Sequence, residues 1–158
     1  KDKAFDSFGQ KTIGFISKPP TYERIEKMLT IVREEKQENV ELVFDGYRGE
    51  KYSIRLEEIA YFKAAGSYTE IYSYASGSDT TECFVISKKI GEVELEMRDY
   101  CVLRVHKSFL INLANVKNVG EVLTVRNLDE KIPIGRKYKE QVKRVYASYV
   151  SDKVRKRI

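Results

Sequence analysis

Hydrophobic and polar residues alternate along much of the chain after residue 39, and this period of two is typical of β-strands with one buried face. Residues 40–44 and 52–56 both alternate, and the Arg48-Gly49-Glu50 segment between them predicts a hairpin turn. Pro133 has no backbone N–H, so its strand is expected at a sheet edge. Similar runs occur at 59–63, 68–74, 82–86, 101–105, 116–119, 123–126 and 131–134. The pattern predicts a mainly β fold, an antiparallel meander or sandwich of several short sheets.

Two stretches in this region have helical spacing instead. Residues 88–97 predict a short helix, with Ile90, Val93 and either Leu95 or Met97 available to a core. Residues 136–150 predict a final helix with an apolar stripe and a basic face, and residues 151–158 are expected to be a frayed basic tail. The stripe comprises Tyr138, Val142, Val145, Tyr146 and Tyr149, and the basic face comprises Lys139, Lys143 and Arg144.

Residues 1–35 form a separate unit in this pattern. A short buried strand is expected at 12–16, Lys18-Pro19-Pro20 breaks it, and Thr21 can cap a helix. The apolar positions of that helix are Ile25, Met28, Leu29 and Val32. Residues 36–39 are then a linker to a domain at 40–150. A unit this small cannot bury its own apolar faces, so it is expected to be poorly ordered or to pack against a neighbouring chain.

Charge is distributed unevenly along the chain, which has 158 residues and a net charge of +5. Residues 1–100 contain fifteen Lys and Arg against nineteen Asp and Glu, whereas residues 101–158 contain fourteen against five. Folding does not require such a concentration of cations. A surface that binds a polyanion does, because released counterions drive its association with phosphates. The alternative is a merely solvated basic face.

Several other function classes are not indicated. No apolar run approaches about 18 residues and no secretion signal is recognisable, so a cytoplasmic protein without a membrane span is expected. Cys83 and Cys101 lack zinc-ligand spacing and are expected to be reduced, buried thiols. Gly-x-Ser-x-Gly, Gly-x-Gly-x-x-Gly and His-Glu-x-x-His motifs are absent, and His106 is the only histidine. We therefore expect no enzyme activity, no metal and no cofactor.

Three segments place cations and hydrogen-bonding side chains at the ends of predicted strands. They are residues 66–70, 104–108 and 135–139. In the second segment, the alternation of a strand turns Val105 inward and directs Arg104 outward. DNA recognition requires such side chains on rigid supports, from which they can reach phosphates and base edges.

The same segments resemble the LytTR-type DNA-binding domain of bacterial response regulators. The similarity spans roughly residues 40–148 and rests on three motifs in order. These are Ile-Ala-Tyr-Phe-Lys-Ala-Ala-Gly-Ser-Tyr at 59–68, Arg-Val-His-Lys-Ser-Phe-Leu-Ile-Asn-Leu-Ala-Asn-Val at 104–116, and Ile-Pro-Ile-Gly-Arg-Lys-Tyr at 132–138. The resemblance implies a LytTR-like antiparallel β-sandwich whose strand-end loops enter successive major grooves of double-stranded promoter DNA.

The resemblance also implies roles for individual side chains. The positions implied to read bases are Thr69, Lys107 and Lys137. Those implied to contact phosphates are Arg104, His106, Arg136 and Lys139, and Arg136 could also read guanine. The implied interface further includes Ser67, Tyr68 and Ser108. Two positions depart from the family pattern, since Gly135 stands where serine is frequent and Val102 where an aromatic residue is frequent.

Residues 1–35 resemble the last strand, the Lys-Pro pair and the last helix of a receiver domain, and Lys18 matches the lysine of its phosphorylation switch. The given sequence contains no phosphoacceptor strand or acidic pocket, so a receiver remnant is expected. Together the two resemblances imply a two-component transcription regulator. Two copies would bind tandem direct repeats, and a sensor histidine kinase would act through the full receiver. A protein-interaction β module and a single-stranded nucleic-acid binder remain as alternatives.

Overall fold

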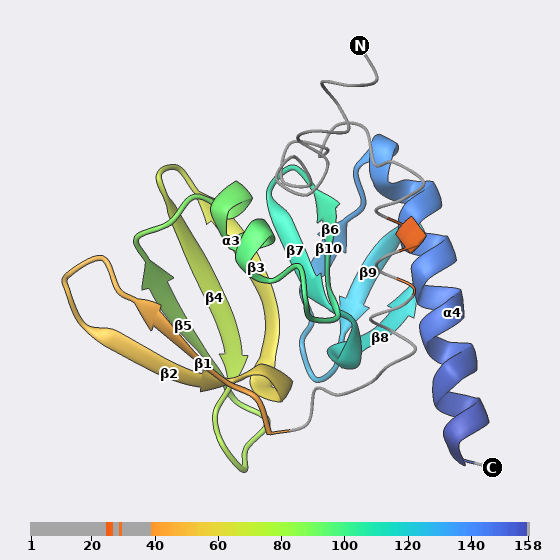
Figure 1. Ribbon diagram of the computed structural model, residues 1–158, viewed down its shortest axis with the longest axis horizontal. Coiled ribbons are helices and arrows are strands. Elements are labelled where there is room, and N and C mark those ends of the chain that lie inside the picture. The colour runs from red at the N-terminus through yellow and green to blue at the C-terminus, as the bar shows by residue number, and fades with distance from the viewer. Residues whose placement is uncertain (1–24, 27–28, 30–38, 158) are drawn as a thin grey trace, which may run out of the picture.

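The computed structural model describes residues 25, 26, 29 and 39–157, which contain three antiparallel sheets and the helices α3 and α4 (Figure 1). The largest sheet has five strands in the order β5-β4-β3-β7-β6. Its strands are β3 (Ile59–Ala65), β4 (Tyr68–Tyr74), β5 (Thr81–Ile86), β6 (Val102–His106) and β7 (Phe109–Asn112). The bounds of β3, β4, β5 and β6 agree with the strands expected from the sequence to within two residues, so the alternation located these strands well.

Both faces of the central strands are buried. Successive residues of a strand point to opposite faces, so neighbouring side chains enter different clusters. On β3, Tyr61 belongs to one hydrophobic cluster and Phe62 to a second. Ile111 and Leu110 of β7 divide between the two clusters in the same way. Ile111 lies opposite both Tyr61 and Leu103 in the strand register, so the first cluster is continuous across three strands. The five-stranded sheet is therefore the middle layer of the molecule.

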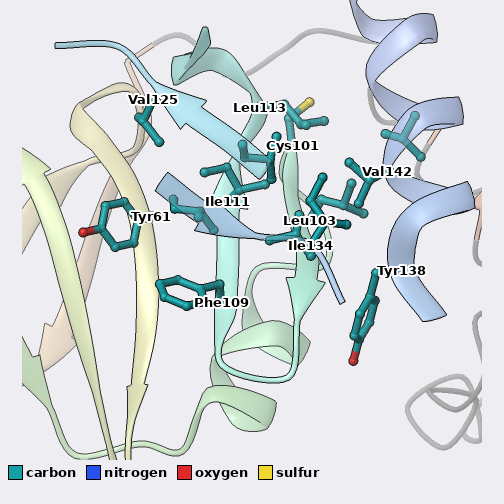
Figure 2. Close-up of a cluster of buried hydrophobic side chains, with 14 of the residues drawn as sticks. Tyr61, Cys101, Leu103, Phe109, Ile111, Leu113, Val125, Ile134, Tyr138 and Val142 are labelled. Atoms are coloured by element: carbon teal, nitrogen blue, oxygen red, sulfur yellow. The ribbon is translucent and has the colours of Figure 1, made fainter. Parts of the chain in front are cut away.

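One face of this layer is covered by a three-stranded sheet and α4 (Lys139–Arg157). The sheet has the order β10-β9-β8. Its strands are β8 (Val116–Val119), β9 (Val122–Val125) and β10 (Lys131–Pro133). Figure 2 shows Leu103 of β6, Ile111 of β7 and Val142 of α4 in the resulting core. Pro133 lies on the edge strand β10, as expected.

The opposite face is covered by α3 (Ile90–Glu96) and by the hairpin of β1 (Glu41–Asp45) and β2 (Lys51–Arg55). Phe44 and Val93 contribute buried side chains to this second cluster, and the Phe44 ring meets the Phe62 ring edge-on at 6.2 Å. The hairpin is attached to the end of β5, since Ser87 N–H donates to the Asp45 carbonyl at 3.0 Å.

Two buried asparagines join the layers. Asn112 is 1% exposed, its Nδ2 donates to the carbonyls of Leu56 and Ile59 at 2.9 Å, and its Oδ1 accepts from Ala114 N–H at 3.1 Å. Asn115 Nδ2 donates to the Ile59 carbonyl as well, at 2.7 Å. These bonds tie the end of β7 to the backbone at the start of β3, so Asn112 is a structural residue.

Three expectations about local structure were wrong. The chain forms a 3₁₀ turn, η4 (Arg136–Tyr138), before α4, and α4 continues to Arg157, so residues 151–157 are helical rather than a frayed tail. Cys101 is buried but Cys83 is exposed, because β5 is an edge strand.

No helix among the described residues combines the length and apolar character that a membrane crossing requires.

Most of the proposed receiver remnant, including Lys18, lies outside the described residues. Ile25, Glu26 and Leu29 are described and are helical, as the spacing in this segment predicted. Leu29 is 5% exposed and belongs to the first cluster, with Ile25 packed against it. Glu26 Oε1 lies 3.8 Å from Arg144 Nη2 on α4. These three residues therefore pack against the 40–157 domain.

Candidate nucleic-acid interface

The three segments singled out in the sequence lie at one end of the molecule, at the top of Figure 1. Main-chain hydrogen bonds connect them: Ala64 N–H at the end of β3 donates to the Ser108 carbonyl at 2.8 Å, and Gly135 N–H donates to the Val105 carbonyl at 2.8 Å. The β6–β7 turn is thus bonded to its neighbours on both sides. We call residues 66–69, 106–108 and 135–139 together the loop surface.

The β3–β4 turn presents two of its predicted residues and buries the third. Gly66 has a φ of 65°, a left-handed conformation that suits glycine, and the turn leaves Ser67 and Tyr68 exposed. Thr69 is fully buried, and its hydroxyl donates to the Lys88 carbonyl at 2.7 Å. The expectation that Thr69 reads a base is therefore wrong, because this side chain faces the core and its hydroxyl is already used.

The β6–β7 turn divides its cations between two tasks. Lys107 is exposed at the tip of the turn. Arg104 is only 13% exposed, and its Nη1 donates to Glu94 Oε1 of α3 at 2.8 Å. Its Nε donates to the His106 carbonyl at 2.7 Å and its Nη2 to the Lys107 carbonyl at 2.5 Å. The expected phosphate contact of Arg104 is corrected accordingly: its guanidinium holds the turn that carries Lys107.

His106 is partly buried beside Phe109, with the ring centroids 5.8 Å apart. Its Nδ1 accepts a hydrogen bond from Ser108 N–H at 3.1 Å, which places the proton of the neutral ring on Nε2. Burial lowers the pKa of His106 below its ordinary 6.5, and the charges of Lys107 and Arg104 lower the pKa further. The ring is therefore neutral at pH 7, with an Nε2–H group that a phosphate oxygen can accept.

The third segment connects β10 to α4 and carries the remaining predicted cations. Arg136 and Lys137 are exposed, whereas Tyr138 is 9% exposed and anchors the turn in the core. Lys137 Nζ lies 5.1 Å from the centre of the Tyr138 ring. Lys139 is exposed at the start of α4, with Glu121 Oε2 3.6 Å from its Nζ.

Gly135 allows the third segment to pack closely against the Tyr138 ring and the backbone of His106. A Cβ atom at this position would lie 2.9 Å from Tyr138 Cδ2 and 3.6 Å from His106 Cα. A larger residue here would displace the Tyr138 ring that anchors the turn. The glycine that stands here, where the resemblance makes serine frequent, thus fits the tight packing around Tyr138 in this chain.

The arrangement favours a binding surface over a catalytic site. Three loops at the same end of the molecule carry exposed cations and hydroxyl groups, which can contact phosphates and base edges. Within the described part of the chain, no cluster of three His, Cys, Asp or Glu side chains is suitable for a metal ion.

Comparisons with known proteins agree with this geometry. The family model of the LytTr DNA-binding domain matches residues 49–147. A solved LytTr DNA-binding domain from Bacillus cereus is similar in fold, with a TM-score of 0.52 and 17% sequence identity over 66% of this chain and 94% of that chain. No curated protein matches. The mainly β fold with several antiparallel sheets is therefore confirmed as LytTr-like, and the chain belongs to the family of LytTr DNA-binding domains.

Proposed function

We propose that this protein is the output domain of a response regulator that recognises specific sequences in double-stranded promoter DNA through the loop surface. The observation that supports this most strongly is the convergence of three loops, linked by main-chain hydrogen bonds, that expose Lys107, Arg136 and Lys137 at one end of the molecule. Side chains held on such a support can meet successive phosphates and base edges together.

The exposed residues divide by task. Lys107 and Lys137 enter the major groove, where a lysine can donate to guanine O6 and N7. Arg136 and Lys139 grip phosphates, Arg136 also being able to read guanine, and His106 donates from Nε2. The residues that complete the polar contacts are Ser67, Tyr68 and Ser108. Base contacts specify the sequence, whereas phosphate contacts fix the position of the protein on the duplex.

The same proposal includes the setting of a two-component system. Two copies bind tandem direct repeats in a promoter. A sensor histidine kinase phosphorylates the complete receiver and thereby promotes pairing, and the protein acts in the cytoplasm without catalysing a reaction. The support is the family to which the chain belongs, together with the receiver-like order of residues 1–35.

Selection from a library of random duplexes tests the proposal without a known operator. The 158-residue chain is expected to enrich one sequence motif, and Lys107→Ala is expected to relax a single position of it. The loss of discrimination there should be about 1–3 kcal/mol. Lys131→Ala is the matched control, because Lys131 is also exposed but lies at the end of β10 away from residues 135–139.

The competing functions give different outcomes in the same experiment. A single-stranded binder would retain unpaired oligonucleotides in preference to duplex. A protein-interaction module would enrich no sequence motif and would bind DNA only weakly, whatever the salt concentration. Enrichment that Lys107→Ala leaves unchanged would contradict the assignment of Lys107 as a base reader.

A further inference from the structure

Two exposed tyrosines contact each other beside the loop surface. Tyr47 of the β1–β2 turn is 44% exposed, Tyr68 of the β3–β4 turn is 43% exposed, and their rings meet edge-on with centroids 5.8 Å apart. They are the only aromatic side chains among the large hydrophobic ones that are exposed in the described part of the chain. An exposed cluster of this kind on a soluble domain marks a contact surface, because aromatic rings at a partly wet interface offer both apolar area and a hydroxyl group.

The turn that carries Tyr47 is held firmly in place. Gly46 N–H donates to the Glu50 carbonyl at 2.7 Å, and Gly49, with a φ of 89°, donates to the Gly46 carbonyl at 3.2 Å. Tyr47 N–H donates to the Val85 carbonyl of β5 at 3.3 Å. The turn is thus tied both to itself and to the five-stranded sheet, so Tyr47 is presented from a rigid support, as the residues of the loop surface are.

The charges of the turn leave its arginine as the outward-facing group. Asp45 pairs with Lys51 Nζ at 2.5 Å, and Glu50 accepts a hydrogen bond from the Tyr52 hydroxyl at 2.5 Å, so both carboxylates are engaged along the hairpin. Arg48 is exposed, and its guanidinium carbon lies 5.1 Å from the centre of the Tyr47 ring. No ion pair among the described residues includes Arg48.

We propose that the β1–β2 turn is a fourth DNA contact, in which Arg48, Tyr47 and Tyr68 bind the sugar–phosphate backbone next to the groove entered by the β3–β4 turn. The Arg48 guanidinium pairs with a phosphate, while the two rings pack on the deoxyribose and their hydroxyls donate to phosphate oxygens. This contact reads no base and lengthens the protected segment of the duplex. It rests on the proposed function, since it extends the same surface.

The experiment is a salt series of binding titrations, by fluorescence anisotropy, of the full chain on a fixed 30-base-pair duplex. A backbone contact does not depend on sequence, so no operator is needed. Arg48→Ala is expected to weaken binding and to lower the slope of log K against log salt by about one unit. Arg48→Lys should keep the slope, and Tyr47→Ala should weaken binding at every salt concentration.

The matched control is Arg126→Ala. Arg126 is also exposed and its guanidinium also lies 5.1 Å from a tyrosine ring, but this ring is that of Tyr74, at the end of β4 opposite Tyr68. Arg126→Ala should leave the slope unchanged, and urea midpoints should show that each variant is folded. If Arg48→Ala and Tyr47→Ala match this control while Lys139→Ala, which removes a proposed phosphate contact of the loop surface, lowers the slope, the turn is no contact although the proposed function stands. If Lys139→Ala also has no effect on the slope, both proposals fall.

Discussion

At the scale of single residues, Arg104 and Lys107 show how two cations of one turn acquire different roles. Lys107 is exposed, whereas the Arg104 guanidinium lies against α3 and donates to a carboxylate and two carbonyls. Charge alone cannot distinguish the two residues in the sequence. The distinction depends on Glu94, ten positions earlier, which α3 brings beneath the turn.

Arg104→Ala should therefore lower stability as well as DNA affinity. The substitution removes the donor to Glu94, which is itself only 17% exposed, and to two turn carbonyls. The expected loss is about 1–3 kcal/mol of unfolding free energy, measured by urea denaturation. Arg98→Ala, at an exposed position just after α3, serves as the control. A loss of affinity with an unchanged urea midpoint would instead make Arg104 a direct phosphate ligand.

His106 should give the protein a pH-dependent stability. Its pKa in the folded protein lies below the ordinary 6.5, so between these values the unfolded chain binds more protons than the folded one. The free energy of unfolding should fall as the pH is lowered below about 6.5, down to the folded-state pKa.

The measurement for His106 is urea unfolding at pH 7.5 and 5.5, compared with His106→Asn. Asparagine keeps an acceptor near Nδ1 for Ser108 N–H but does not titrate in this range. The variant should lose less stability than the parent between the two pH values. Equal losses would show that His106 is not the group responsible.

At the scale of secondary structure, buried polar side chains fix how the layers join. Asn112, at the end of β7, bonds to the backbone on either side of the 3₁₀ turn η2 (Leu56–Glu58). Asn112→Ala removes one donor from each of the Leu56 and Ile59 carbonyls and leaves Ala114 N–H without its acceptor. We expect a loss of about 1–3 kcal/mol, seen as a lower urea midpoint with an unchanged m-value.

The exposed Asn118 of β8 is the control for this prediction, and its replacement by alanine should have little effect on the midpoint. If both substitutions gave the same midpoint, the hydrogen bonds of Asn112 would contribute no net stability.

The strands could be predicted from the sequence because alternation is a local signal. Tyr61 and Phe62, for example, belong to opposite clusters, as a period of two requires. Non-local contacts were not predictable. Thr69 shares the buried face of β4 with Ile71, but the Lys88 carbonyl that accepts its hydrogen bond lies beyond the next strand. The extension of α4 to Arg157 has no strong apolar signal. The contact between Tyr47 and Tyr68 likewise requires the hairpin to be placed beside β5.

At the scale of the whole molecule, the layered architecture separates stability from binding. The two hydrophobic clusters lie on either face of the five-stranded sheet, and the loop surface lies at one end of it. The cations there can meet phosphates without disturbing either cluster. The positive charge of residues 101–158, noted in the sequence, is thus placed partly on this end, through Lys107 and residues 135–139.

The central claim is that the loop surface binds duplex DNA with sequence preference, and one measurement tests it most directly. The full chain is titrated by fluorescence anisotropy against the selected duplex and a scrambled one, across a salt series. We predict tighter binding to the selected duplex, by a margin that Lys107→Ala and Lys137→Ala reduce and Lys131→Ala does not, together with a steep salt dependence. Equal affinity for both duplexes, or a preference that none of the three substitutions reduces, would contradict the claim.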